Sequence, residues 1–228
     1  MSFKVTWLGH ASFAMDIDGH KVLLDPYLKD NPAANADPAK LDADFILISH
    51  GHGDHVGDVL TIARRTGATC ISNHEIVYWL HNQGITNTHA QHIGGGFNYP
   101  FGYVKMTIAE HGSMLPDGSD GGNPVGFLIT SKPGTRVYFA CDTGLFYSMK
   151  LIGEEGLDLA FLPIGDNFTM GPDDAFRAVK LLEPKVVIPV HYNTFGVIKQ
   201  DGAAWVKRVN DETDVKAVLL NPGESYEV

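Results

Sequence analysis

Four side chains that can bind metals lie within six positions near residue 50. An apolar run, 45–48, leads into the pattern H-x-H-x-D-H, formed by His50, His52, Asp54 and His55. Imidazole nitrogens and carboxylate oxygens are the ligands that zinc and similar divalent ions accept. Gly51 and Gly53 allow the chain to turn between a strand end and a helix start. The pattern therefore predicts a metal site rather than a solvated loop.

Further ligands are expected after later strands. Four ligands are too few for two metals and one more than the three that usually hold a catalytic zinc. Three coordinating residues each follow an apolar run, where an α/β sheet presents its functional loops: His111, Asp142 and His191. Each alone is typical of an ordinary loop residue. Together they complete a set for two metals.

Strands and helices alternate along the chain, and they must position these ligands. Short alternating or continuous apolar runs predict strands at 3–8, 12–18, 21–25, 45–49, 68–72, 103–110, 125–130, 136–141, 157–164, 185–191 and 215–220. Helical spacing predicts helices at 56–67, 74–84, 172–184 and 202–212. Residues 94–102 and 111–124 fit neither pattern and are expected to be loops. This order indicates two sheets packed face to face with helices outside.

Composition favours one compact domain over residues 1–228. The chain is 44% hydrophobic, which is enough for a substantial core. Its apolar runs are all far shorter than the roughly 20 residues that span a bilayer, and its first residues alternate like a strand rather than a secretory signal. We therefore expect a cytoplasmic protein with no membrane contact. Cys70 and Cys141 end apolar runs and are expected to be buried and unpaired.

The net charge indicates which class of substrate or partner the protein binds. Seventeen basic and 27 acidic residues give a formal charge of −10, which disfavours an extended polyanion. We expect a small-molecule substrate and no nucleic acid. A homo-oligomer is compatible with the sequence.

The ligand set resembles that of the metallo-β-lactamase superfamily, whose motifs are H-x-H-x-D-H, a later His, a later Asp and a final His. The segments WLGHAS, LLDPY, CDTGLF and PVHYNTF look more closely like uncharacterised metal-dependent hydrolases related to the ascorbate-6-phosphate lactonase-like branch. The resemblance implies a four-layer αββα sandwich of two mixed β-sheets with helices on the outer faces and metals at one edge. It implies one metal on His50, His52 and His111, and a second on Asp54, His55 and His191. Asp142 would lie between the two.

Two such ions favour hydrolysis. They can share a water and hold it as hydroxide near neutral pH, ready to attack a lactone, another ester, an amide or a phosphoester. Asp54 would be a ligand and would orient the nucleophile. His52 stands where redox di-iron relatives would have Glu, so zinc is expected, with manganese or iron as alternatives.

Other residues are expected near the site. His10 would donate to a developing oxyanion, orient a ligand or serve only the fold. Asp25 is either a support for a ligand histidine or a turn residue before Pro26. Three residues directly after His191 are expected to line the substrate pocket or to cap the following turn: Tyr192, Asn193 and Thr194. Asp166 and Asn167 end another apolar run and are expected to reach the edge of the site.

Two other functions remain alternatives. Nucleases of the same superfamily share the ligand set, but this chain is acidic and its basic residues are scattered. A non-catalytic metal-binding or sensing protein would also keep such a ligand set. Hydrolytic turnover separates the second alternative from the enzyme.

Overall fold

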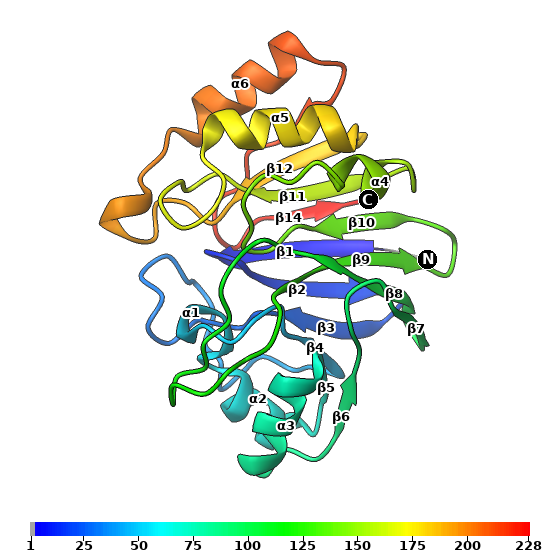
Figure 1. Cartoon of the computed structure of the whole chain (residues 1–228), viewed down its shortest axis with the longest axis vertical. Helices are drawn as coiled ribbons and strands as arrows, with labels where there is room; N and C mark the ends of the chain where they lie inside the picture. Colours follow the sequence, from blue (N-terminus) through cyan, green and yellow to red (C-terminus); the bar gives the residue numbers. More distant parts are fainter. Residues whose placement is uncertain (1–2) are drawn as a thin grey trace.

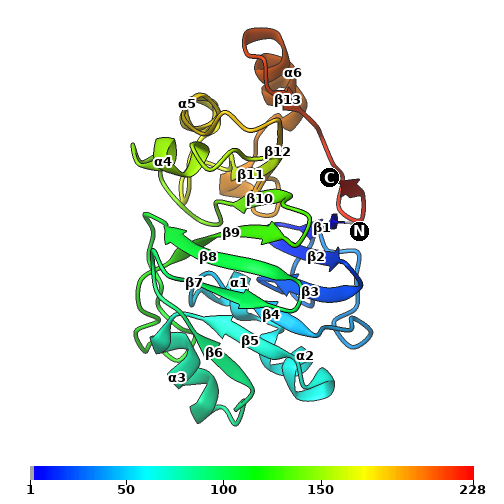
Figure 2. The same cartoon turned by 90° about the vertical axis from the view of Figure 1, so that its right-hand side faces the viewer.

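Two seven-stranded sheets pack face to face, with helices on their outer faces (Figures 1 and 2). The computed structural model describes residues 3–228. The first sheet has the order β14-β1-β2-β3-β4-β5-β6, with β1 (Phe3–Gly9), β2 (Ser12–Ile17), β3 (His20–Leu24), β4 (Phe45–Leu47), β5 (Thr69–Ser72), β6 (Thr88–Ala90) and β14 (Ser225–Glu227). The second has the order β13-β12-β11-β10-β9-β8-β7, with β7 (Gly96–Tyr99), β8 (Gly102–Ile108), β9 (Val125–Ser131), β10 (Arg136–Phe139), β11 (Leu159–Pro163), β12 (Val186–Val190) and β13 (Lys216–Ala217).

The helices divide between the two sheets. Beside the first sheet lie α1 (Gly53–Val56), α2 (Val59–Thr66) and α3 (His74–Asn82), and beside the second lie α4 (Met149–Gly153), α5 (Pro172–Leu182) and α6 (Gly202–Glu212). No helix in the described part of the chain is long and apolar enough to cross a membrane. The architecture is the expected four-layer sandwich of two mixed sheets.

Alternating side chains of the first sheet enter two different cores. Leu24 and Leu47 face the second sheet, while Leu23, Ile46 and Ile48 pack against α2 and α3. Successive residues of a strand point to opposite faces, so an apolar run without interruption fits a strand covered on both sides. This explains why the apolar run before the metal-binding pattern shows no polar alternation.

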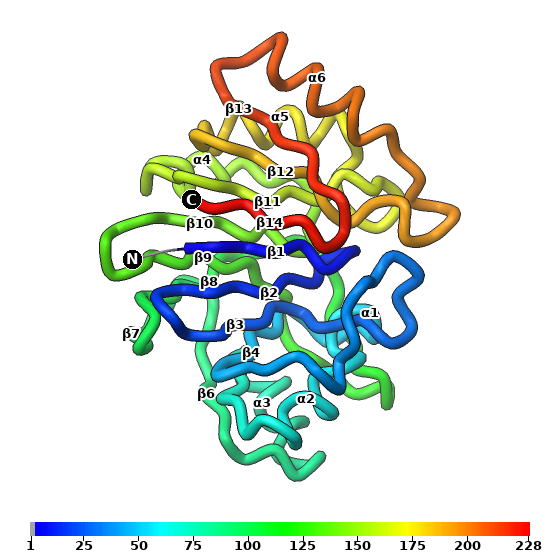
Figure 3. Tube along the Cα trace, turned by 180° about the vertical axis from the view of Figure 1, so that it is seen from behind, coloured from blue at the N-terminus to red at the C-terminus, as the bar shows by residue number. Residues whose placement is uncertain are grey.

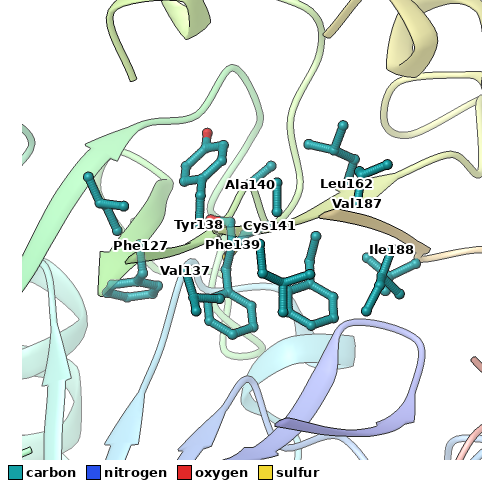
Figure 4. Close-up of a cluster of buried hydrophobic side chains, with 14 of the residues drawn as sticks. Phe127, Val137, Tyr138, Phe139, Ala140, Cys141, Leu162, Val187 and Ile188 are labelled. Atoms are coloured by element: carbon teal, nitrogen blue, oxygen red, sulfur yellow. Dashed lines mark hydrogen bonds between the residues drawn. The ribbon is translucent and has the colours of Figure 1, made fainter. Parts of the chain in front are cut away.

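Aromatic rings fill the space between the sheets. Phe139 of β10 stacks on Phe161 of β11 at a centroid distance of 4.8 Å, and Phe13 of the first sheet meets Phe139 edge-on at 5.1 Å. Figure 4 shows the neighbouring side chains of this core, which include Phe127, Tyr138 and Ile188. A rigid core directly beneath the ends of β10, β11 and β12 supports the loops that follow them.

Parallel pairing brings the ligand-bearing segments to one edge. β4 is parallel to β3 and β5, and β11 is parallel to β10 and β12. The loops after these strands emerge on the same side of the molecule, at the left of Figure 1. Segments distant in sequence therefore meet there.

Several elements differ from the sequence-based expectations. Residues 94–102 were expected to be a loop, but β7 lies within them and pairs antiparallel with β8. It is a mostly exposed edge strand, so no buried face imposes a hydrophobic pattern on its sequence. β6, β14 and α4 were not predicted; β14 runs beside β1, as Figure 3 shows. Residues 111–124 form the expected loop, apart from one bridge between Met114 and Asp120, and both cysteines are buried and unpaired as expected.

Candidate metal centre

The first group of candidate ligands consists of His50, His52 and His111. One ring nitrogen from each lies within 4.8 Å of the others. His50 Nε2 lies 3.1 Å from His52 Nδ1, and the His111 ring centroid lies 5.0 Å from the centroids of both other rings. His50 follows β4, whereas His111 comes from the loop after β8 in the other sheet. The group therefore joins the two sheets.

The second group consists of His10, Asp54, His55 and His191, again with ligand atoms within 4.8 Å. Asp54 and His55 lie on α1. The sequence predicted a helix that starts at residue 56, after the metal-binding pattern, but α1 starts inside the pattern, at Gly53. His10 Nε2 lies 3.2 Å from Asp54 Oδ2, and the His10 and His191 ring centroids are 3.9 Å apart. His10 is thus a member of this group by geometry, alongside the three ligands expected there.

Asp142 lies between the two groups. Its Oδ2 atom is 3.4 Å from His55 Nε2, 2.9 Å from His191 Nε2 and 3.5 Å from His111 Nε2. The carboxylate is buried, with 3% of its surface exposed. One oxygen therefore contacts histidines of both groups.

Asp25 supports two of the histidines from behind. Its Oδ2 lies 2.9 Å from His55 Nδ1, and its Oδ1 accepts a hydrogen bond from the Ser49 backbone N–H at 2.8 Å. The Ser49 hydroxyl donates to Asp25 and lies 2.9 Å from His50 Nδ1. A ligand histidine whose Nδ1 is held in this way presents Nε2 in a fixed direction.

Backbone strain is concentrated at this edge. Four residues that carry or adjoin these side chains have φ values in the left-handed region, near +50°: His10, Asp25, Cys141 and His191. Such conformations are costly for residues other than glycine and persist where surrounding structure demands them. At each of these residues the unusual φ turns the backbone sharply near a strand end and directs the side chain inward.

Burial and mutual charge shift the pKa values of the site. Burial and the neighbouring His191 lower the pKa of His10 to about 4, so the ring is neutral at pH 7. Burial, followed by the effect of His55, holds the pKa of His50 well below its usual range. Burial alone would raise the pKa of Asp142, but His191 and His55 hold it well below its ordinary value. The neutral imidazoles of His10 and His50 and the ionised carboxylate of Asp142 are in protonation states that bind a cation.

Unpaired buried atoms test whether metals fit this site. His55 Nε2, Asp142 Oδ1 and both ring nitrogens of His191 are buried without a hydrogen bond. His191 Nε2 is only 2.9 Å from Asp142 Oδ2, but the contact does not have hydrogen-bond geometry. Buried polar atoms without partners are costly. Coordinated cations would satisfy them, so the donor set fits divalent metals.

The remaining predicted residues have other contacts. The Tyr192 ring is buried and stacks on Trp7 at 5.9 Å. Asn193 is exposed and its side chain accepts from the Gln200 backbone. Exposed Asp166 accepts from the backbone of the next residue, Asn167. Thr194 is the loop residue that reaches the cluster, with its hydroxyl 3.0 Å from His10 Nδ1.

Sequence reasoning missed other residues that hold the site. The Ser113 hydroxyl accepts from the Gly51 backbone at 3.0 Å and donates to the Gly121 carbonyl, which ties the loop after β8 to the metal-binding pattern. Phe195 and Tyr27 meet the His10 ring edge-on, at centroid distances of 5.3 and 6.0 Å. Ser49 carried a sequence signal, since it directly precedes His50. The others carried none, because their roles depend on contacts between distant loops.

The chain is similar to known metal-dependent hydrolases in sequence. A family model described as "Beta-lactamase superfamily domain" matches residues 4–191. The chain is 45% identical to a UPF0173 metal-dependent hydrolase of Methanopyrus kandleri over 98% of this chain and 99% of that protein. It is 47% identical to one of Heliobacterium modesticaldum, over 97% and 95%.

Solved structures agree in fold. The chain is similar to Igni18, a novel metallo hydrolase from the archaeon Ignicoccus hospitalis, with a TM-score of 0.92 and 36% identity over 100% of this chain and 99% of that one. The metallo-β-lactamase fold protein YhfI of Bacillus subtilis has a TM-score of 0.77 with 100% coverage of both chains. At 14% identity that second likeness shows the fold alone.

Proposed function

The chain is a metal-dependent hydrolase that belongs to the UPF0173 family of the metallo-β-lactamase superfamily, and from that premise we propose a two-metal centre that hydrolyses a small molecule. The bond cleaved would belong to a lactone, another ester, an amide or a phosphoester. One metal would be held by His50, His52 and His111, and the other by Asp54, His55 and His191, with His10 beside the latter three. Zinc suits this nitrogen-rich set best, with manganese or iron as alternatives.

The position of Asp142 carries this proposal. Its Oδ2 atom lies within 3.5 Å of histidines from both groups. A carboxylate shared in this way supports two neighbouring cations rather than one, because a single ion would leave one histidine group without a partner. When bound, two divalent metals would lower the pKa of a shared water and polarise the attacked bond.

The chain's own groups would orient this site. The Asp54 carboxylate can only accept, so neutral His10 donates its Nε2–H to Asp54. The Nδ1 atom of His10 then carries no hydrogen and accepts the hydroxyl hydrogen of Thr194. Burial would raise the pKa of Asp54, but the hydrogen bond from His10 lowers it well below its usual value. Asp54 is therefore ionised at neutral pH, and His10 holds its carboxylate in a fixed direction.

A substrate panel with an Asp142 variant tests the proposal. Purified, metal-loaded protein is assayed on a lactone, a carboxylic ester, an amide and a phosphodiester. We expect turnover of at least one class, and a fall of about 100-fold or more in Asp142→Ala, as for loss of a group that holds the reactive centre. The matched control is Asp211→Ala, since Asp211 is exposed on α6 and pairs with Lys207. Equal turnover in Asp142→Ala, or no turnover of any class, contradicts the proposal.

A further inference from the structure

Three large apolar side chains are exposed on three different loops at the edge that carries the candidate ligands. We call them the apolar rim: Met114, Phe168 and Val197, which are 64%, 54% and 64% exposed. They lie in the loop between β8 and β9, the loop between β11 and α5, and the short 3-10 helix η1 (Gly196–Ile198). All three loops are on the left of Figure 1. Apolar side chains gathered around a site are typical of a binding surface.

Each rim residue lies in a loop that a hydrogen bond ties to a segment bearing a candidate ligand. Met114 follows Ser113, which is hydrogen-bonded to the backbone next to His50. Phe168 lies in a turn whose Met170 N–H donates to the carbonyl of Thr143, directly after Asp142. Val197 is on η1, which Asn193 ties down by donating its backbone N–H to Ile198. The rim residues are therefore carried by loops whose positions are fixed relative to the candidate ligands.

Aromatic rings continue the apolar surface inward. Phe195 and Tyr27 are half-buried, and their rings lie edge-on to His10. The Tyr27 hydroxyl is turned away and donates to the Asp30 carbonyl at 2.7 Å. The Tyr27 ring also lies over Gly57, where an added Cβ would come within 3.1 Å of Tyr27 Cδ2. Aromatic rings rather than hydroxyl groups thus lie against His10, which contacts Asp54.

Charge at this edge distinguishes among the possible substrates. The loops 25–37, 50–57, 110–124, 142–148, 165–171 and 191–201 contain two lysines, Lys29 and Lys199, no arginine, and ten Asp or Glu residues. Proteins that bind phosphate groups usually supply arginine, lysine or a helix N-terminus. Three of the ten are Asp25, Asp54 and Asp142, whose charge bound metals would offset. The other seven carboxylates repel an anion and outnumber the two lysines. The loops around the centre therefore disfavour an anionic phosphoester.

We propose that the substrate is an uncharged ester or lactone whose alkyl or aryl group is covered by the apolar rim, an inference that rests on the proposed hydrolase function. Hydrolysis adds water across the acyl–oxygen bond, so that the acyl carbon gains the hydroxyl group and the leaving oxygen takes the proton. The apolar group remains on the rim during the reaction and needs no charged partner. Transfer of its methylenes out of water supplies the selectivity.

A chain-length series tests this inference. The metal-loaded protein is assayed on p-nitrophenyl acetate, propionate, butyrate and hexanoate, and on anionic bis(p-nitrophenyl) phosphate. We expect kcat/KM to rise about twofold for each added methylene, less than full burial would give because the rim is partly open. The phosphate diester is expected to be turned over more slowly than any of these esters.

Variants of the rim residues show which side chains produce the preference for longer acyl chains. Phe168→Ser and Met114→Ser are expected to lower the ratio of hexanoate to acetate kcat/KM by about threefold to tenfold each, as for loss of part of a hydrophobic pocket. The control is Leu151→Ser, because Leu151 is 64% exposed on α4, away from the loops of the rim. It should leave the ratio unchanged. Light scattering of each variant accompanies the assay.

The outcomes separate this inference from the proposed function. Turnover that is independent of chain length, or faster on the phosphate diester, overturns the inference and leaves a hydrolase. A wild-type dimer that Phe168→Ser converts to a monomer also overturns it, because the rim is then covered by a second copy of the chain. Absence of turnover on every substrate contradicts the proposed function itself, and the inference with it.

Discussion

The Oδ2 atom of Asp25 lies 2.9 Å from Nδ1 of His55, and neither side chain is exposed. Through Ser49 the same carboxylate also reaches His50. Burial would lower the pKa of His55, but Asp142 and Asp25 raise it well above its ordinary value. One residue outside both ligand groups thus orients a histidine in each.

Replacement of Asp25 should therefore weaken metal binding. In Asp25→Asn an amide replaces the carboxylate, and the Ser49 hydroxyl and His55 lose their shared charged acceptor. We expect metal affinity to fall about 10-fold to 100-fold, the usual effect of losing such a support. Competition with a chelator measures it, and circular dichroism checks that the variant is folded. An unchanged dissociation constant in a folded variant would show that Asp25 serves only the turn.

Thr194 is expected to act through His10. Thr194→Val removes the partner of His10 Nδ1, so the ring is held by a hydrogen bond on one side only, at Asp54. We expect kcat to fall about tenfold, the lower end of effects seen for orienting groups, with KM little changed. Thr194→Ser keeps the hydroxyl and should restore most of the rate. If the valine and serine variants behave alike, the hydroxyl has no orienting role.

The aromatic core beneath the site should dominate stability. Phe139 is 1% exposed and contacts both Phe161 and Phe13. Phe139→Ala should lower the free energy of unfolding by about 3–5 kcal/mol, through lost burial and the cavity left behind. Urea unfolding measures this, with Tyr147→Ala as a control because Tyr147 is 83% exposed. A loss below about 1 kcal/mol would mean that the core relaxes around the gap.

One ion pair should make stability depend on pH. Asp158 Oδ1 lies 2.7 Å from Lys185 Nζ. Burial would raise the pKa of Asp158, but the Lys185 hydrogen bond lowers it overall. Because the folded pKa lies below the unfolded one, the stabilisation is complete above the unfolded value of about 3.9 and is lost as the pH falls towards the folded value. Asp158→Asn should therefore cost about 0.5–1 kcal/mol at pH 7, and the difference should shrink below about pH 4. A constant difference from pH 3 to pH 7 would rule out this ionic contribution.

Much of the site could be predicted from sequence because its ligands follow strands that are themselves readable. Buried parallel strands appear as apolar runs, and His50, Asp142 and His191 follow the ends of such strands within three residues. Parallel pairing brings these three to one edge, whereas His111 follows the antiparallel strand β8. The fold class followed from the same alternation and from the resemblance to a known superfamily.

What escaped prediction depends on contacts between distant segments. Strand β7 lies in the glycine-rich segment 94–102 and is paired on one side only, so its sequence lacks the pattern of a buried strand. The contact of Thr194 with His10 spans 184 positions, and no local spacing encodes it. The exposure of Phe168 could not be predicted either, because the sequence does not show whether an aromatic side chain in a loop packs into the core or faces solvent.

Metal stoichiometry tests the central claim most directly. Metal content per chain is measured by inductively coupled plasma mass spectrometry on protein loaded with zinc and then freed of excess metal, with hydrolysis followed before and after chelation. We expect two ions per chain, close to one in His111→Ala, and hydrolysis that chelation abolishes and metal restores. A single ion in the wild-type protein, or full hydrolysis by metal-free protein, would contradict that claim.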